Sequence, residues 1–228
     1  MKSNLDVLRA IAVGLVLVDH VILYLTCYGK YTTTLAFSPL RLGRFGVLVF
    51  FIHTAYVLLL SLSRGNEENK FVQAWGFYVL RIFRIYPLVW VVVIACVMLH
   101  IPAAPAQPYI RPTTMALIAN LSLFQNVAHV PSTIGPLWSL PYEIQMYIVI
   151  PCLFWSMRLR HCWFWLVLAY ITSVAICLGG ATIGIRGGFL LDFVPCFLAG
   201  GVAYFRNRSV RPIFPGALVI VFGPEYAK

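Results

Sequence analysis

The sequence predicts an all-α, polytopic membrane protein, and three observations support this fold class. Hydrophobic residues make up 61% of the 228 positions and charged residues only 11%, whereas a soluble domain has roughly 45–50% and about 25%, respectively. The mean hydropathy of +0.87 leaves too little polar surface to cover a soluble globule. The apolar residues also gather in runs long enough, as helices, to cross a hydrocarbon layer of about 30 Å.

Six runs are predicted to be full transmembrane helices, and a last stretch, Ile213–Phe222, is only a partial seventh. The first run contains Asp19 and His20 and lacks a small-residue cleavage site, so we expect a retained helix and not a cleaved signal peptide. The six runs are Val7–Leu25, Val47–Leu62, Ile85–Ile101, Leu137–Met157, Trp163–Gly179 and Gly188–Phe205.

The segment between the third and fourth runs is different in character. Pro102–Pro112 is rich in proline, and Asn126–Pro136 contains further helix breakers, so both are predicted to be loops. Between them, Thr113–Phe124 is apolar but only about a dozen residues long, which favours a re-entrant or interfacial piece over a full crossing. Because no internal repeat or low-complexity tract interrupts the chain, we expect residues 1–228 to form a single membrane-embedded domain.

The net charge of +10 is distributed between the apolar runs. This pattern is typical of membrane topology and not of a nucleic-acid-binding stripe, so we expect membrane lipids and no nucleic acid as partners. A cytoplasmic N-terminus, in the cell (inner) membrane, places eleven basic residues inside and five outside. The inner residues are Lys2, Arg9, Arg64, Lys70, Arg81, Arg84, Arg158, Arg160, Arg206, Arg208 and Arg211, and the outer ones are Lys30, Arg41, Arg44, Arg111 and Arg186.

The six cysteines and five histidines do not indicate a metal site. Nearly all cysteines lie inside apolar runs and none forms a CxxC pair, so we expect small buried hydrophobic side chains and not disulfides. The histidines lack an HxxxH pair or any other metal-binding spacing, so no metal is expected.

Arg9 and His20 are the first candidate site residues. They are eleven positions apart, and at about 100° per residue both side chains lie on one helical face, with His20 about 16 Å deeper. A histidine at mid-membrane depth indicates a functional group that faces the bundle or a cavity; as a neutral imidazole it could accept a proton from a hydroxyl. The alternative is a histidine hydrogen-bonded between helices. Asp19 lies about 100° round the helix and is not expected to pair directly with His20.

Two further groups of residues are candidates. Arg81 and Arg84 are predicted at the cytoplasmic mouth of the third run, where two guanidinium groups could bind phosphate; simple positive-inside anchoring is the alternative. Glu143 begins the fourth run, with Tyr147 one turn later, and a carboxylate there needs a partner or a cavity. Capping by Ser139, with Glu143 near the helix N-terminus, is the ordinary structural explanation.

Five segments together resemble the acyltransferase-3 family of integral membrane acyltransferases. The first segment, LDVLRAIAVGLVLVDH, is similar to the family's LDGLRAIAxxxVxxxH opening, with its Arg-x10-His spacing. RIFRIYPLVW resembles RRxxRIxPxYW, and LWSLPYEIQMYIVIP resembles WSLxVExxFYxxxP. The remaining two are GRFGVLVFFIHTAY, which resembles GxxGVDxFFxxSGF, and GGFLLDFVPCFLAGGVAYF, which looks like a later FxxxFxxGxxxAxx helix.

The resemblance implies transfer of an acyl group, usually acetyl, from acyl-CoA to a hydroxyl of an extracytoplasmic carbohydrate or lipid-linked glycan. Acetyl-CoA is then a donor substrate, and no permanently bound cofactor is expected. The implied roles are general base for His20, orientation or polarisation for Glu143, and donor-phosphate contacts for Arg9, Arg81 and Arg84. Trp138, Ser139 and Tyr147 would line the substrate site; His53 and His100 lack the motif context for catalysis.

The chain also departs from the family pattern. Leu48 replaces an aspartate, Thr54-Ala55 replaces Ser-Gly, and Ile144 replaces a second glutamate. Family members usually continue through about ten helices, so we expect a domain that is incomplete at its C-terminus. Two alternatives therefore stay open: a non-catalytic truncated remnant and a small-solute transporter or flippase, although the repeated halves typical of a transporter are not evident.

Overall fold

The computed structural model describes residues 2–28, 39–65, 69–105, 107–157, 160–182 and 190–209. Within these ranges the chain forms seven α-helices and two short 3₁₀ helices and no strand, so the all-α prediction is confirmed. The α-helices are α1 (Lys2–Cys27), α2 (Pro39–Arg64), α3 (Lys70–Met98), α4 (Thr114–Leu121), α5 (Leu140–Ser156), α6 (Cys162–Thr182) and α7 (Val194–Ser209), and the 3₁₀ helices are η1 (Gly135–Ser139) and η2 (Leu190–Asp192).

Five helices of the described part are long and apolar enough to cross a membrane. They are Leu5–Cys27, Leu42–Arg64, Lys70–Met98, Gly135–Ser156 and Cys162–Gly179. The sixth predicted crossing, Gly188–Phe205, corresponds to α7, which begins only at Val194 and has 16 residues, short of the roughly 20 that a crossing needs. The partial seventh stretch, Ile213–Phe222, lies outside the described residues.

Helix α3 differs most from its sequence prediction. It has 29 residues and starts at Lys70, fifteen positions before the predicted start at Ile85, and it continues through Pro87. The helix ends in a Schellman motif, in which His100 adopts a φ of 53° and the N–H of Ile101 donates to the carbonyl of Cys96. The early start moves Arg81 and Arg84 from the predicted cytoplasmic mouth into the middle of the helix.

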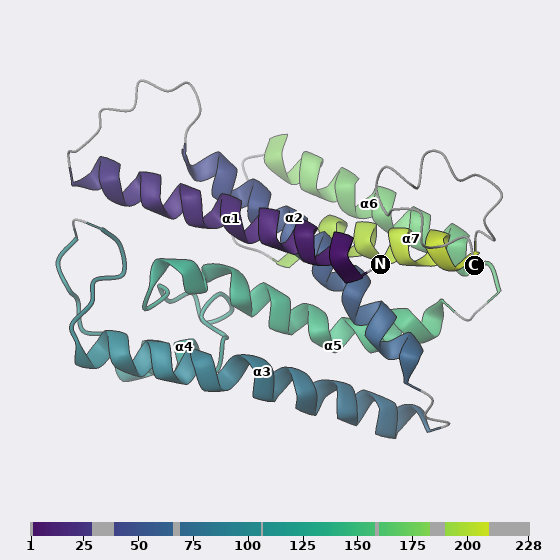
Figure 1. Cartoon of the computed structure of the whole chain (residues 1–228), viewed down its shortest axis with the longest axis horizontal. Helices are drawn as coiled ribbons and strands as arrows, with labels where there is room; N and C mark the ends of the chain where they lie inside the picture. The colour runs from purple at the N-terminus through teal and green to yellow at the C-terminus, as the bar shows by residue number, and fades with distance from the viewer. Residues whose placement is uncertain are drawn as a thin grey trace.

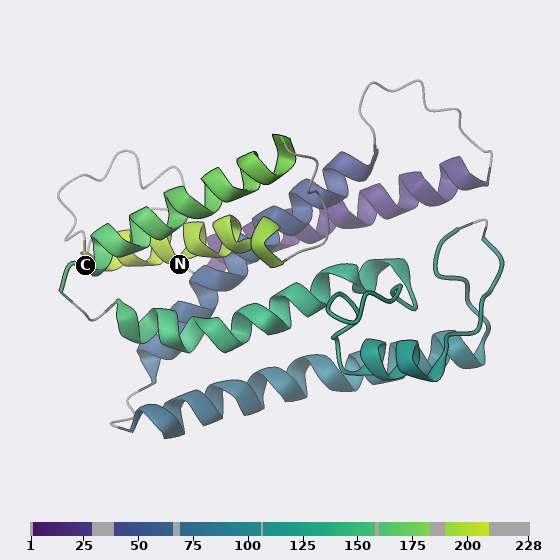
Figure 2. The same cartoon turned by 180° about the vertical axis from the view of Figure 1, so that it is seen from behind.

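The helices alternate in direction along the bundle (Figure 1). Helices α1 and α2 form an antiparallel pair, α7 packs against α2 and α6, and α5 contacts α2. Helix α3 lies along the other side with the short α4 against it, and the rear view shows the same order (Figure 2). The eight-residue α4 is far too short to cross, as the sequence predicted for this segment.

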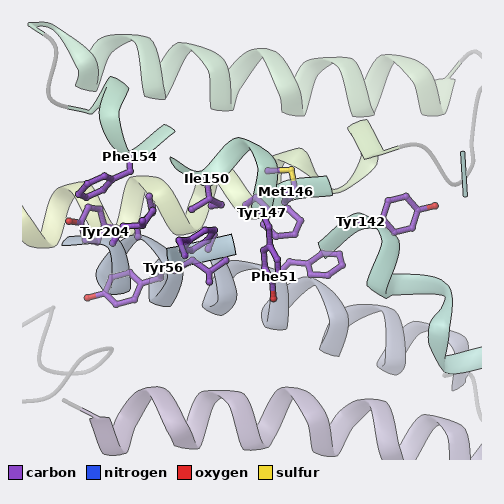
Figure 3. Close-up of a cluster of buried hydrophobic side chains, with 14 of the residues drawn as sticks. Phe51, Tyr56, Tyr142, Met146, Tyr147, Ile150, Phe154 and Tyr204 are labelled. Carbon is purple, nitrogen blue, oxygen red and sulfur yellow. The ribbon is translucent and has the colours of Figure 1, made fainter. Parts of the chain in front are cut away.

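The main core lies where α2, α5 and α7 meet. Phe51 of α2 stacks on Phe197 of α7 with ring centroids 4.7 Å apart, and Ile150 and Phe154 of α5 are almost completely buried. Figure 3 shows these α5 side chains together with Phe51, Tyr56 and Tyr204. The cluster fixes α5 against α2 and so sets the position of the side chains at the start of α5.

Two buried amides attach the loop before α5. Asn120, with no exposed surface, donates to the carbonyl of Pro131 (3.1 Å) and accepts from the N–H of Thr133 (2.8 Å). Gln125 donates to the carbonyl of Leu137 at 3.2 Å. Because each unpaired buried polar group destabilises the fold, these bonds hold the loop in one conformation and position the helix that carries Glu143.

The cysteines are all unpaired, but their burial varies. Cys96 is buried, whereas Cys27 and Cys152 are exposed on the surface of the bundle. The prediction of buried cysteines was therefore wrong for these two. In a membrane helix an apolar side chain can face lipid, so an apolar run does not identify its buried positions.

Candidate active site

A cavity of about 360 Å³ lies between α1, α2, α3 and α5. Its wall holds more cationic than anionic side chains, which suits it to an anionic ligand. The charged and polar residues of the lining are Arg9, Arg64, Arg81, Arg84, Asp6, Glu143, His53, Thr54 and Tyr147.

Arg81 and Arg84 reach the cavity from the middle of α3. The guanidinium of Arg81 lies over the Phe77 ring, with its Cζ 5.5 Å from the ring centroid. Its Nε is buried and has no hydrogen-bond partner in the described part of the chain. Arg84 is exposed at the cavity wall. Two neighbouring guanidinium groups with free donors provide the paired, charge-assisted contacts that phosphate oxygens accept.

Glu143 is the buried carboxyl group of this cavity. Its side chain is only 6% exposed and accepts a short hydrogen bond from the Tyr147 hydroxyl one turn later on α5. Arg9, Arg81 and Arg84 are close enough to act on its carboxylate electrostatically. Glu143 thus lies in the first turn of α5, as predicted, and shares the cavity lining with the arginines of α1 and α3.

The structure also places His53 in the cavity wall, although the sequence analysis assigned this residue no role. Its side chain is 7% exposed, and its Nε2 has no hydrogen-bond partner among the described residues. The charged side chains of Arg9 and Asp6 act on the ring from α1. A histidine in this position can donate or accept a hydrogen bond inside the cavity.

His20 does not line this cavity. Its Nδ1 hydrogen-bonds to the Val16 carbonyl of its own helix at 2.7 Å, and the ring is half-buried. It lies eleven residues beyond Arg9, or about 16 Å along α1. Asp19 is buried against Gly43 of α2, and its Oδ1 has no hydrogen-bond partner among the described residues. The structure therefore brings together Arg9, Arg81, Arg84, Glu143 and Tyr147 but leaves His20 apart from them.

Trp138 and Ser139 also lie outside the lining. Trp138 packs against Tyr142 and Phe193, with ring centroids 6.4 and 6.0 Å away. Ser139 has a helical backbone conformation and makes no side-chain capping hydrogen bond. The capping explanation for Ser139 was therefore wrong, because an N-cap serine needs an extended backbone to reach the N–H groups of the first turn.

His53 and Arg64 line the cavity but were not among the predicted site residues, although their spacing in the sequence could have indicated them. His53 and Arg64 of α2 are eleven positions apart, as Arg9 and His20 are on α1, so the same periodicity places both on one face of α2. Both line the cavity. Among the described residues, no group of three His, Cys, Asp or Glu side chains could hold a metal ion.

The fold and the cavity define a class: a polytopic α-helical membrane protein with a buried carboxylate and clustered arginines between its helices. The family model of the acyltransferase-3 domain matches residues 2–223. The chain therefore belongs to the acyltransferase-3 family of membrane acyltransferases. No solved structure matches the chain.

One similar protein is the peptidoglycan O-acetyltransferase OatA of Listeria monocytogenes. The two sequences are 28% identical over 158 residues, which is 65% of this chain and 23% of OatA. The match thus covers about a quarter of that relative's length.

Proposed function

We propose that the chain is part of an O-acyltransferase that moves an acetyl group from acetyl-CoA to a hydroxyl of an extracytoplasmic carbohydrate. The observation that carries the proposal is the convergence of Arg9, Arg81, Arg84 and Glu143 on one cavity. The family membership and the likeness to an O-acetyltransferase support the type of reaction. The acceptor class is inferred from that relative, whose name specifies peptidoglycan.

The arginines favour a phosphate-bearing donor. A CoA thioester carries several phosphate charges, and guanidinium groups bind phosphate through paired hydrogen bonds. With the N-terminus in the cytoplasm, as the charge bias predicts, Arg9 and Arg64 lie toward the side from which CoA arrives. The inner membrane is the location that this orientation implies.

The transfer itself needs a base. The acceptor oxygen attacks the thioester carbonyl, its proton passes to a base, the carbon–sulfur bond breaks, and the CoA thiolate takes up a proton. His20 is the base that the motif indicates, and its Nδ1 contact with Val16 leaves Nε2 available as the acceptor when the ring is neutral. Glu143 orients the arginines and the donor from α5.

The experiment that tests the proposal measures acetyl transfer in membranes that contain the whole protein. Isotopically labelled acetyl-CoA is supplied on the cytoplasmic side, and ester-linked label is measured on cell-wall carbohydrate. We expect transfer by the wild type and loss of CoA binding in the Arg81→Gln/Arg84→Gln variant, at an unchanged protein level. Unchanged CoA binding would show that Arg81 and Arg84 only anchor the helix. Absence of transfer in wild-type membranes would support the alternative of a non-catalytic truncated remnant.

A further inference from the structure

A second cavity, of about 310 Å³, lies at the end of the bundle where α3 ends. Its wall is formed by residues between positions 101 and 113 and by residues 130–133, with Ala116 of α4. Helix α3 ends at Met98, fourteen residues beyond Arg84, or about 21 Å along the helix. No described residue lines both cavities. The second cavity is therefore separate from the arginine-lined one, and the reaction described above does not use it.

Hydrogen bonds between the two loops hold the wall of the second cavity in place. The N–H of Gly135 donates to the carbonyl of Ala103 at 3.0 Å and so joins the loop after α3 to the loop before η1. The Tyr109 hydroxyl donates to the carbonyl of Val97 at 3.3 Å, and the buried Asn120 holds the second loop. The cavity is thus already formed before a ligand arrives, which lowers the entropic cost of binding.

The polar residues of the second cavity are neutral except for one arginine. They are Gln107, Tyr109, Arg111, Thr113, Ser132 and Thr133. Among the described residues, the side chains of Gln107, Arg111 and Ser132 take part in no hydrogen bond or ion pair. Amide and hydroxyl groups both donate and accept hydrogen bonds, as sugar hydroxyls do. The half-buried ring of Tyr109 adds an apolar surface on which a sugar ring can pack. This lining suits a polyhydroxylated ligand.

Arg111 gives this lining its charge. It is exposed, and it is the one charged side chain among the described lining residues, which include no Asp or Glu. A cation without a neighbouring anion attracts a negatively charged group of a ligand. The combination of this cation with neutral polar groups therefore favours an acidic carbohydrate over a neutral one.

The second cavity lies at the end of the bundle toward which His20 lies. Helices α1 and α3 run in the same direction, and the loop after α3 is at the same end of the bundle as the end of α1 in both views (Figures 1 and 2). His20 is seven residues before the end of α1 at Cys27, so the path from Arg9 to His20 leads toward this end. With a cytoplasmic N-terminus, a ligand of the second cavity arrives from outside, opposite to CoA.

We propose that the second cavity binds the acceptor as an acidic carbohydrate, with Arg111 at a carboxylate of the ligand and Tyr109 and Ser132 at a sugar ring. This inference rests on the proposed function, because it takes an extracytoplasmic carbohydrate as the acceptor. It assigns these residues to binding and not to the chemical step.

The test is protection of a single cysteine from labelling. In a variant without its native cysteines, Gln107→Cys places the thiol in the cavity wall and leaves the three proposed contacts intact. His129→Cys is the matched control, because this position is exposed near the same loops but lies outside the lining. The probes are the disaccharide N-acetylglucosaminyl-N-acetylmuramic acid and N,N′-diacetylchitobiose, which has the same sugar backbone but lacks the lactyl carboxylate. Labelling with a membrane-impermeant maleimide and acetyl transfer are measured on one preparation of the whole protein.

We expect the acidic disaccharide to slow labelling of Gln107→Cys and to leave that of His129→Cys unchanged. Diacetylchitobiose should bind about 2- to 5-fold more weakly, the effect of one exposed ion pair. Arg111→Gln should remove this difference between the two probes, and Arg111→Lys, which keeps the charge, should retain it. Saturation-transfer NMR on the wild type and the two Arg111 variants measures the same affinities without any cysteine change.

Three results would overturn the inference. Gln107→Cys that is not protected, in a protein that does transfer acetyl groups, places the acceptor site elsewhere. Equal protection of His129→Cys shows that the probes bind without preference for the cavity. Equal affinity of the wild type for the two disaccharides excludes the contact with Arg111. Specific protection in a protein that transfers no acetyl group would instead support the carbohydrate site and refute the proposed function, so the two failures are distinguishable.

Discussion

Asp19 of α1 occupies the space that a side chain at position 43 of α2 would need. A Cβ added to Gly43 would lie 2.5 Å from Oδ2 and 2.8 Å from Cγ of Asp19. The Asp19 side chain is only 5% exposed, so it has little room to move away. This close approach, together with that of Gly46 to the Ala12 carbonyl, sets the register of the α1–α2 pair.

The first prediction follows from this contact. Gly43→Ala should lower the free energy of unfolding by about 1–3 kcal/mol, since an added methyl group overpacks the interface. The loss should be smaller in an Asp19→Ala background, because the clashing carboxylate is absent. Thermal unfolding in detergent measures both. Gly14→Ala is the control: nothing lies within 4 Å of its added Cβ, so alanine should be neutral or slightly stabilising. Equal losses at positions 43 and 14 would contradict the packing argument.

The second prediction concerns the bond between Tyr147 and Glu143. Tyr147→Phe removes the hydrogen-bond donor of a buried carboxyl group, and leaving a buried polar group without its partner costs about 1–3 kcal/mol. Acetyl transfer should therefore fall by about tenfold or more, with a lower unfolding temperature. Tyr204→Phe is the matched control, because the buried Tyr204 hydroxyl has no partner among the described residues. If the two variants behave alike, the bond does not support the site.

The third prediction separates catalysis from donor binding. His20→Ala should abolish acetyl transfer, because general-base help is typically worth about 10²–10⁴-fold. CoA binding should persist, since His20 lies outside the arginine-lined cavity. Transfer kinetics and binding, measured on one preparation, check both statements. Full activity in His20→Ala would exclude this residue as the base.

The fourth prediction is the orientation in the membrane. In a variant without its native cysteines, a cysteine at Gln107 should react with a membrane-impermeant reagent added outside, and one at Lys70 should not. Both positions are exposed and lie toward opposite ends of α3. Reaction at Lys70 alone would reverse the proposed orientation.

Local patterns in the sequence predicted much of this architecture. Apolar runs located the spans of α1, α2, α5 and α6 to within a few residues, because a hydrocarbon layer requires a minimum apolar length. The apolar-length criterion did not locate the start of α3, which begins at Lys70 and not at Ile85. Arginines normally mark helix ends in membranes, but here Arg81 and Arg84 face a cavity inside the bundle, which only the packing of other helices creates.

The candidate site was predictable only in part, for a related reason. Periodicity predicts which residues share a face of one helix, as it does for Arg9 and His20 on α1. It gives no information about which residue of a second helix lies at the same level. That register depends on Gly43 and Gly46, and it brings His53, and not His20, to the level of Arg9.

The register has a consequence for the size of the donor. Arg64 and His53 are separated by eleven residues of α2, and Arg9 and His20 by eleven residues of α1, which is about 16 Å in each case. His53 and Arg9 lie at the same height along the bundle axis. The interval from Arg64 to His53 is therefore continued by the interval from Arg9 to His20. Under the proposed function, a donor bound through its phosphates at the arginines must extend over the second interval to bring its thioester to His20. A small acyl phosphate lacks that length, so under this proposal the spacing would select donors by the length of their carrier arm and would not discriminate between acyl groups.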